Sequence, residues 1–334
     1  MKKRKGRINS GLFLCYHNIM VVVINIITYV FSFFVIWYAS GVIVDSLSRF
    51  TKRLKLSSFA VSFFVLGILT SIPEFAVGLN SIIQSKPGIF VGNLLGASLV
   101  LFILVIPLLA VLGNGVKMVH QLTPDNLIFS LLVVAAPTFL IADNLLTRTE
   151  SVFLILMYGI LFFYIEKKNG LLTNVREEIN ELKDKHTIEN LAELVLAATL
   201  VFLSSHIIVT QTIYFANMFS VSSFLISIIV LSVGTNIPEL SLAIRAVMAG
   251  KREVALGDYL GSAAANTLFF GIFTLINGSR INIDSYSYKT MMMMLLGLGL
   301  FYWFSRSKQD ISRREGKLLL LFYAVFIVVE VFIK

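Results

Sequence analysis

Residues 57–74 read SSFAVSFFVLGILTSIPE, and residues 222–239 read SSFLISIIVLSVGTNIPE. The two stretches align without a gap at an offset of 165 residues, and the alignment extends to GNLLG at 92–96 and GDYLG at 257–261. Of the 40 aligned positions between 57 and 96, 14 are identical. Two unrelated apolar helices would share some Leu, Ile and Val, but not T-x-I-P-E followed by G-x-x-L-G at one offset. We therefore infer an internal repeat.

The composition is that of a membrane protein. Hydrophobic residues make up 57% of the chain and charged residues only 14%, whereas soluble domains carry roughly a quarter charged residues. Apolar stretches near the length that crosses about 30 Å of hydrocarbon recur along the chain. The expected spans are 20–44, 58–85, 89–113, 126–143, 150–166, 190–213, 222–249, 254–277, 288–305 and 317–333.

The two copies of the repeat are expected to have opposite orientations in the membrane. They fall on the second and third spans and on the seventh and eighth, so an odd number of crossings separates them. Inverted repeats are typical of secondary transporters, whose substrate sites lie near the bilayer midplane. We predict an all-α polytopic membrane protein with about ten transmembrane helices in two inverted five-helix repeats. The predicted parts are a basic N-terminal tail (1–19), a first repeat (20–166), a linker (167–189) and a second repeat (190–334).

Basic residues are distributed unevenly between the two sides of the membrane. The odd-numbered loops carry 18 Lys and Arg residues, and the even-numbered loops together with the C-terminus carry 5. The positive-inside rule then predicts a cytoplasmic 167–189 linker and two external termini in the cell membrane. The basic MKKRKGR at 1–7 opposes this orientation. It suggests the hypothesis that Met20 is the natural start of the chain.

Cysteine and histidine carry no recognisable motif. The single cysteine excludes an internal disulfide, and four scattered histidines without H-E-x-x-H or C-x-x-C give no support for a zinc site. The net charge of +9 is explained by basic residues that fix topology, so no nucleic-acid partner is expected. An intramembrane aspartyl protease needs two membrane aspartates, but Asp258 has no partner within a span. We predict a protein that is not an enzyme and has no covalent cofactor.

Two carboxylates stand in mid-span. Glu74 and Glu239 occupy equivalent positions of the repeat, each directly after a proline. A charge at the bilayer centre costs at least about 2.5–3.5 kcal/mol, and such residues face a cavity, a proton or a cation. Ordinary transmembrane proline kinks are the alternative interpretation, but their recurrence at the fixed offset favours a binding site.

Oxygen atoms are expected around each carboxylate. Because proline donates no backbone hydrogen bond, the helix bends and frees a carbonyl group one turn earlier. Thr70 and Ser71 stand beside the first bend, and Thr235 and Asn236 beside the second. An all-oxygen set with a charge of −2 suits Ca²⁺, which takes about six to eight oxygen ligands, and also two Na⁺ or two protons.

Small and polar residues follow on the third and eighth spans. The GxxxG spacing of GNLLG and GDYLG predicts close helix packing. Asn93 and Asp258 are interpreted as capping residues near the helix starts. Ser262 and Asn266 lie one turn apart, so they share a helix face that could point at the site.

The motif pair resembles a known family. G-x-x-T-S-x-P-E and G-T-x-x-P-E, each followed by G-[ND]-x-x-G, are similar to the α-repeats of the cation/Ca²⁺ exchanger superfamily, in particular prokaryotic sodium/calcium exchangers. The likeness covers about 37–112 and 202–277. The resemblance implies ten helices, with the tilted first helix of each half sliding past a fixed bundle of the other eight during alternating access.

The resemblance also implies a ligand set. Ca²⁺ would be held by Glu74 and Glu239 together with the backbone oxygens of Thr70 and Thr235, and Na⁺ would bind at flanking positions. The family pattern usually continues the first repeat with G-S and places Asn four residues after that Ser.

The chain departs from this pattern in both repeats. It has Ala97 and Leu101 where the family has that Ser and Asn, Asn236 where it usually has Ser, and Asn266 where it often has Asp. One flanking sodium site therefore keeps its serines, at 71 and 262, and the other has lost both. Two Glu alone resemble more closely the calcium/proton antiporters of the same superfamily.

We predict a secondary-active antiporter that exchanges Ca²⁺ for Na⁺. Exchange for H⁺, or transport of another divalent ion such as Mg²⁺ or Mn²⁺, is the alternative on the same fold, and a non-transporting sensor or scaffold remains open. We expect a monomer in the lipid bilayer whose only small partners are these transported cations. The predicted cation-site residues are Glu74, Glu239, Thr70, Thr235, Ser71, Asn236, Ser262 and Asn266.

Overall fold

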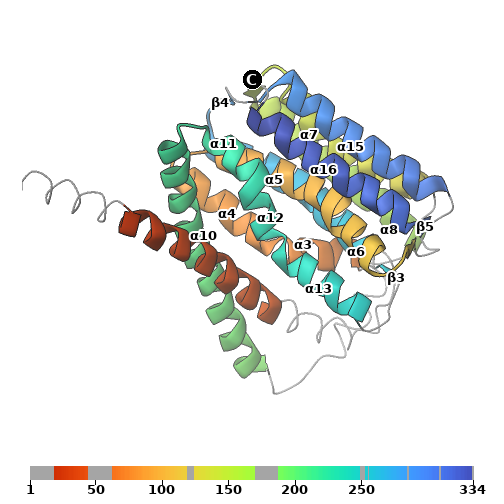
Figure 1. The fold of residues 1–334 in the computed structure, drawn as a ribbon, viewed down its shortest axis with the longest axis horizontal. Helices are drawn as coiled ribbons and strands as arrows, with labels where there is room; N and C mark the ends of the chain where they lie inside the picture. Colours follow the sequence, from red (N-terminus) through yellow and green to blue (C-terminus); the bar gives the residue numbers. More distant parts are fainter. Residues whose placement is uncertain are drawn as a thin grey trace, which may run out of the picture.

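The computed structural model describes most of the chain as helix. The described residues are 19–43, 62–118, 124–169, 187–248, 253–254, 256–283, 286–307 and 310–332. The predicted tail lies outside them except for Ile19, and so does the greater part of the predicted linker. The helices form a bundle with two long helices at one side of it (Figure 1).

The described residues of the first half form five helical stretches. The helix Ile19–Ile43 comes first. In the third stretch the chain changes from α-helix to π-helix over Leu101–Val105, just before Pro107. The missing N–H of Pro107 interrupts regular α-helical hydrogen bonding there. The remaining elements are the π-helix η1 (Ser62–Leu66), α3 (Gly67–Thr70) and α4 (Ile72–Ile83); α5 (Gly88–Val100), the π-helix η2 (Leu101–Val105) and α6 (Ile106–Leu112); α7 (Pro124–Leu140); and α8 (Arg148–Asn169).

The second half repeats this order. Its elements are α10 (Thr187–Phe219); α11 (Ser223–Ile226), the π-helix η3 (Ser227–Leu231), α12 (Ser232–Thr235) and α13 (Ile237–Met248); α14 (Leu256–Asn277); α15 (Tyr288–Ser307); and α16 (Arg313–Phe332). The bounds of η3, α12 and α13 are those of η1, α3 and α4 displaced by the repeat offset. In contrast, α14 is continuous where its counterpart is divided into α5, η2 and α6.

The predicted fold class is confirmed. Each of the ten expected spans corresponds to one helix or one broken series of helices within the described residues. Among the described residues, five helices are long and apolar enough to cross a membrane, or six if the bent pair Phe63–Thr70 and Ile72–Ile83 is one span. The predicted domain boundaries stay predictions.

Short strands join the loops at the helix ends. Val116 lies opposite Ile311 in the antiparallel pair β1 (Val116–Met118) and β5 (Asp310–Ile311), and Ile281 lies opposite Leu146 in the pair β4 (Ile281–Asn282) and β2 (Leu145–Leu146). These two registers are related by the repeat offset, so the symmetry of the halves extends to the loops. A further strand, β3 (Glu253–Val254), pairs with β1 in parallel.

Glycine allows the two repeats to approach closely at the centre of the bundle. α14 packs against η1 and α3, and α5 packs against η3 and α12. A methyl group added at Gly96 would overlap the carbonyl oxygen of Ile228, and one added at Gly261 would overlap that of Phe63. This confirms close packing as the role of GxxxG at these two glycines.

The helix Ile19–Ile43 and α10 lie beside the bundle and contact each other (Figure 1). The Tyr29 hydroxyl is 2.9 Å from the Thr212 hydroxyl, and the Tyr29 ring packs on Phe215. α10 also packs along α4, where Asn80 Nδ2 donates to Ser205 Oγ at 2.6 Å. Both repeats therefore meet at these peripheral helices.

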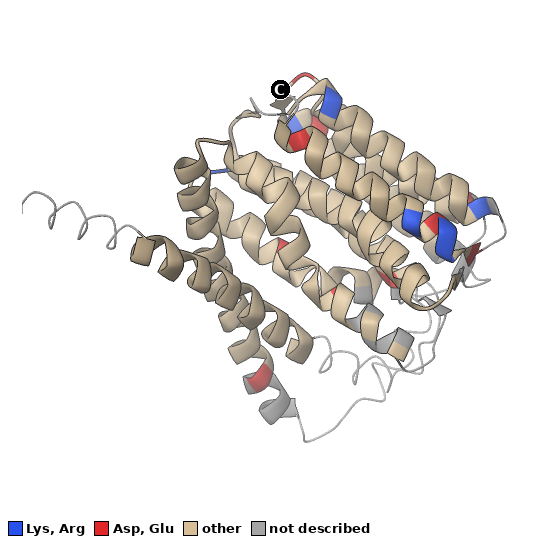
Figure 2. Ribbon diagram, in the orientation of Figure 1, with Lys and Arg blue, Asp and Glu red and all other residues tan. Residues whose placement is uncertain are grey.

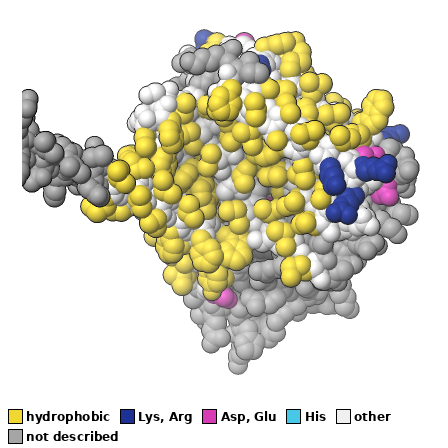
Figure 3. Space-filling model, in the orientation of Figure 1, with side chains coloured by type: hydrophobic (Ala, Val, Ile, Leu, Met, Phe, Trp, Pro, Cys, Tyr) yellow, Lys and Arg dark blue, Asp and Glu magenta, His cyan; other side chains and the backbone are white. Residues whose placement is uncertain are grey.

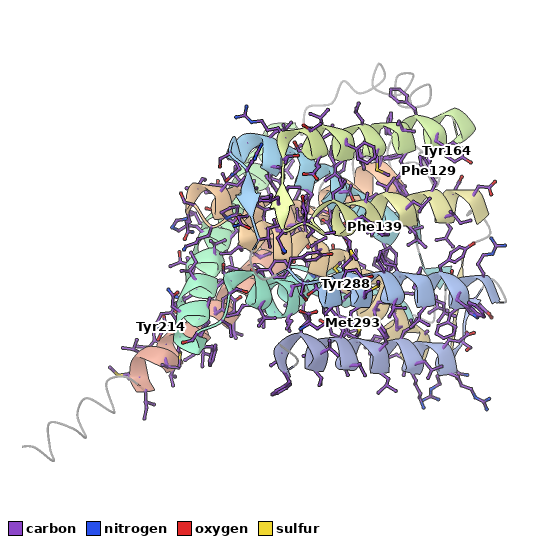
Figure 4. All side chains as sticks on the ribbon, turned by 90° about the horizontal axis from the view of Figure 1, so that it is seen from above. Phe129, Phe139, Tyr164, Tyr214, Tyr288 and Met293 are labelled. Atoms are coloured by element: carbon purple, nitrogen blue, oxygen red, sulfur yellow. The ribbon has the colours of Figure 1, made fainter. Side chains whose placement is uncertain are left out.

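The outer surface is that of a multi-pass membrane protein. Among the residues coloured in Figure 2, the body of the bundle carries a few acidic residues, and the Lys and Arg residues gather near helix ends. Hydrophobic side chains cover most of the described surface on one face (Figure 3), and Trp303 is 73% exposed. On α7 and α8, Phe129 and Tyr164 lie beside each other with ring centroids 5.4 Å apart (Figure 4). The orientation in the membrane stays a prediction.

Candidate functional site

Each repeat contains a helix break at the T-x-I-P-E motif. Ser71 joins α3 to α4 with φ −85° and ψ 13°, and Asn236 joins α12 to α13 with φ −88° and ψ 10°. Pro73 falls in the first turn of α4, where its missing N–H needs no helical partner. The axes of Phe63–Thr70 and Ile72–Ile83 differ by 51°. The bend predicted at each proline is thus a break between two helices.

The two carboxylates stand in the first turns of the helices that follow the breaks. Glu74 is 1% exposed and Glu239 is 0% exposed. Among the described residues, Glu74 Oε2 and both carboxylate oxygens of Glu239 have no hydrogen-bond partner. The two carboxyl groups also lie within electrostatic range of each other and repel when both are ionised. Helix N-termini stabilise negative charge by up to about 2 kcal/mol, less than the several kcal/mol that a buried ion loses in hydration. The site therefore requires protons or cations.

The threonine of one repeat meets the carboxylate of the other. Thr70 is the last residue of α3 and Thr235 the last of α12, and their side chains are buried. The Thr235 hydroxyl interacts with the Glu74 carboxyl group of the other repeat. Glu74 and Thr235, which are 161 positions apart in the sequence, are therefore brought to one place in the bundle.

A pair of serines flanks the first break. Ser71 Oγ is 2.7 Å from Ser262 Oγ, and Ser71 Oγ also donates to the Gly67 carbonyl oxygen at 2.9 Å. Both serine side chains are buried. The hydroxyl oxygens add neutral donor atoms beside the carboxylates, which are suitable ligands for Na⁺ or Ca²⁺.

The equivalent place beside the second break lacks this pair. Asn236 Nδ2 donates to the Ser232 carbonyl oxygen at 2.7 Å, within its own repeat. The position equivalent to Ser262 is the buried Ala97, which offers no oxygen. Asn266 faces the first repeat, since its Nδ2 donates to Ser98 Oγ at 3.3 Å, but its Oδ1 has no partner among the described residues.

The sequence interpretation missed one polar pair. The prediction that Asn93 caps a helix is wrong, because α5 begins at Gly88 and Asn93 lies more than one turn inside it. Asn93 Oδ1 instead accepts a hydrogen bond from Thr235, and Asp258 Oδ1 accepts one from Thr70. A polar residue at the same place in both copies of G-[ND]-x-x-G was the available signal.

The atoms that the site offers to a cation are oxygens. Among the described residues no group of three or more His, Cys, Asp and Glu side chains could hold a metal ion. A bound cation would therefore rely on the two glutamates and on neutral hydroxyl, amide and carbonyl oxygens. Such a set is suited to hard cations.

Comparison with known proteins identifies relatives along nearly the whole chain. The model of the sodium/calcium exchanger protein family matches residues 24–165 and 190–332. The chain is 25% identical to the inner membrane protein YrbG of Escherichia coli over 84% of this chain and 89% of that protein. It is also 25% identical to the sodium/calcium exchanger MaX1 of Methanosarcina acetivorans, over 88% of this chain and 95% of that protein. The putative antiporter CaxA of Alkalimonas amylolytica is 26% identical over 86% and 92% of the two chains.

Solved structures share the fold. A structure of the sodium-calcium exchanger NCX_Mj soaked with 2.5 mM Na⁺ and 10 mM Sr²⁺ superposes with a TM-score of 0.62. It is 20% identical, and the match covers 92% of this chain and 99% of that one. A second structure of NCX_Mj, soaked with 2.5 mM Na⁺ and 0.1 mM Sr²⁺, gives a TM-score of 0.63 with the same identity and coverage.

Proposed function

The chain belongs to the sodium/calcium exchanger protein family, and on this premise we propose that it is a secondary-active antiporter that exchanges Ca²⁺ for Na⁺ by alternating access. The observation that carries the proposal is the burial of Glu74 and Glu239, from equivalent positions of the two repeats, with oxygens that lack partners. Two such carboxylates in a membrane interior are stable only with compensating positive charge.

The proposed ligands come equally from both repeats. Glu74 and Glu239 supply the charge, and Thr70 and Thr235, which end the helices before the breaks, supply main-chain carbonyl oxygens. One Ca²⁺ neutralises both carboxylates, and so do two Na⁺ or two H⁺. Because ionised carboxylates without a cation would be costly to enclose in the membrane interior, the return step requires the competing ions, and transport becomes exchange.

Na⁺ is favoured as the exchanged ion by the serine pair. Ser71 and Ser262 place two hydroxyl oxygens beside the first break, where they are suited to a flanking Na⁺. H⁺ is the second candidate, because the equivalent place beside Asn236 is occupied by Ala97 and offers no such pair. Mg²⁺ or Mn²⁺ in place of Ca²⁺ is a further variant of the same proposal.

The test is radioactive Ca²⁺ uptake into proteoliposomes that contain the purified protein. We expect an outward Na⁺ gradient to drive uptake and a pH gradient of the same free energy to drive much less. Uptake driven by the pH gradient alone would support H⁺ exchange. Competition by unlabelled Mg²⁺ and Mn²⁺ in the same assay reports which divalent ion is preferred.

A non-transporting protein on this fold would behave differently. Glu74→Gln should abolish uptake if Glu74 binds the transported ion. Glu330→Gln is the matched control, because Glu330 is also a buried glutamate, on α16, and accepts from Thr290 at 3.1 Å outside the site. If the wild-type protein shows no gradient-driven uptake of any of these divalent ions, the proposed function is overturned.

A further inference from the structure

Two threonine hydroxyls make hydrogen bonds that cross from one repeat to the other. Thr70 Oγ1 is 3.3 Å from Asp258 Oδ1, and Thr235 Oγ1 is 3.3 Å from Asn93 Oδ1. The two donor threonines are separated by the repeat offset of 165 residues, and so are the two acceptors, Asn93 and Asp258. Each hydroxyl also lies 3.3 Å from a carbonyl oxygen three residues earlier in its own helix. The same contact is therefore built twice.

The acceptors stand on helices that are held against the opposite repeat. On α5, Gly96 contacts the backbone at Ile228, and on α14, Gly261 contacts the backbone at Phe63. Neither helix can shift without a clash or the loss of this packing. Each hydroxyl bond therefore ties the last residue before a break to a fixed support in the other repeat.

The two supports differ in charge. Asn93 is neutral and 0% exposed, and its Nδ2 has no partner among the described residues. Asp258 carries a carboxyl group that interacts electrostatically with Glu239. Within the described part of the chain, Asp258 does not form a group of three with the two glutamates that could hold a metal ion.

We propose that Asp258 and Asn93 are paired positioning residues of the cation site, each acting through the threonine that precedes the break in the opposite repeat, and that Asp258 strengthens divalent-cation binding. The inference rests on the proposed function and extends it to residues outside the ligand set. Both roles follow from the two contacts and from the difference in charge between their acceptors.

The positioning role concerns the main-chain oxygens of Thr70 and Thr235. When its side-chain hydroxyl is hydrogen-bonded to an acceptor in the other repeat, a threonine rotates less freely. Its main-chain carbonyl group therefore moves less as well. Ligand oxygens that are already in place bind an ion more tightly than oxygens that must first be ordered. Loss of the acceptor should therefore weaken cation binding without removing a ligand.

The charge role concerns Asp258 alone. A negative charge near the site attracts a divalent cation twice as strongly as a monovalent one, because the Coulomb energy scales with the product of the charges. A hydrogen bond to a charged acceptor is also stronger than one to a neutral acceptor. The Thr70 side of the site is thus expected to be held more firmly than the Thr235 side.

Double-mutant cycles test the pairing. Thermal unfolding of the purified protein is measured for Thr70→Val, Asp258→Ala, Thr235→Val, Asn93→Ala and their double variants. We expect the pairs Thr70 with Asp258 and Thr235 with Asn93 to be non-additive, because residues in direct contact are coupled. The exchanged pairs, Thr70 with Asn93 and Thr235 with Asp258, are the matched controls and should be additive. Additivity in all four cycles would overturn the pairing.

Ca²⁺ titration of the purified protein tests the effect on the site. We expect Asp258→Ala to raise the half-saturating Ca²⁺ concentration by about tenfold. Asp258→Asn, which keeps an acceptor for Thr70, should raise it by about threefold and should change the half-saturating Na⁺ concentration less. Equal effects of the Ala and Asn variants would overturn positioning through the hydroxyl bond. Ca²⁺ binding by Asp258→Asn equal to the wild type would overturn the charge role.

Failure of the proposed function would be recognised separately. A wild-type protein that binds no Ca²⁺ would overturn the exchange proposal, whereas the thermal cycles would still report whether the threonine bonds exist. Asp258→Asn also serves as the conservative variant if Asp258→Ala does not fold, because it removes the charge while it keeps the size and the acceptor.

Discussion

The break at Ser71 and the break at Asn236 have nearly the same backbone and different side chains. Their φ and ψ angles agree within a few degrees. Ser71 Oγ lies 2.7 Å from a serine of the other repeat, whereas the side-chain hydrogen bond that Asn236 makes among the described residues stays within its own repeat, and position 97 is alanine. Identical geometry therefore supports unequal chemistry in the two halves.

The comparison separates what shapes the site from what selects the ion. Among the residues shared by both repeats, Thr, Pro, Glu and Gly determine the breaks, the buried carboxylates and the close packing. The positions that differ lie around them: Ser71 and Asn236, Ala97 and Ser262, Asn93 and Asp258, Leu101 and Asn266. We expect substitutions of the shared residues to abolish binding or folding, and substitutions of the differing residues to change affinity and preference.

The largest effect is expected from the shared carboxylates. Glu74→Gln and Glu239→Gln should each reduce Ca²⁺ uptake by roughly 100-fold or more, since removal of one partner of a buried ion pair costs about 3–5 kcal/mol. Equal losses, measured as initial rates of uptake, would establish that the two breaks contribute equally. Normal uptake by either variant would contradict a shared site.

A smaller effect is expected from the glycines that bring the repeats together. Gly96→Ala and Gly261→Ala should each destabilise the protein by about 1–3 kcal/mol, because the added methyl group meets a backbone carbonyl oxygen that cannot move away easily. Gly159→Ala and Gly299→Ala are matched controls in α8 and α15, where an added methyl group has no atom within 4 Å. These control substitutions should increase the free energy of unfolding by about 0.5–1 kcal/mol, because alanine favours a helix more than glycine does.

Thermal unfolding in detergent measures both effects. If the two repeats pack in the same way, the losses at Gly96 and Gly261 will be similar. If only one of the two variants loses stability, the two repeats do not pack in the same way. If neither variant loses stability, the close approach of the helices is contradicted.

The smallest effect is expected from the residues that differ. Ser71→Ala should raise the half-saturating Na⁺ concentration about fivefold, because one hydroxyl ligand contributes about 1 kcal/mol. Ser81→Ala is the matched control, since Ser81 is a buried serine of α4 that bonds to Gly78 of its own helix. The double variant Asn236→Ser with Ala97→Ser should create a second serine pair and lower the half-saturating Na⁺ concentration. An effect of Ser81→Ala as large as that of Ser71→Ala would contradict a special role for the serine pair.

The sequence predicts the framework of the molecule well because apolar length and proline act locally. The spans follow from runs of apolar residues, and the breaks follow from the prolines at 73 and 238. The close packing at Gly96 and Gly261 follows from GxxxG. Each of these features depends on residues that are near one another in the sequence.

Contacts between distant residues were harder to predict. Asn93 was interpreted as a cap because its true partner, Thr235, lies 142 positions away in the other repeat. The strands are only two or three residues long, too short to show an alternating pattern. The alignment of the repeats marks positions 93 and 258 as equivalent, but it does not show which helix each side chain faces.

The central claim is that the two inverted repeats form one cation site between Glu74 and Glu239. Calorimetric titration of the purified protein with Ca²⁺, in the absence of Na⁺, tests it most directly by counting the ions bound. We predict one Ca²⁺ bound per wild-type chain, and none bound at the same concentrations by either Glu74→Gln or Glu239→Gln. Two ions per wild-type chain, with one lost in each variant, would show two separate sites and contradict the claim.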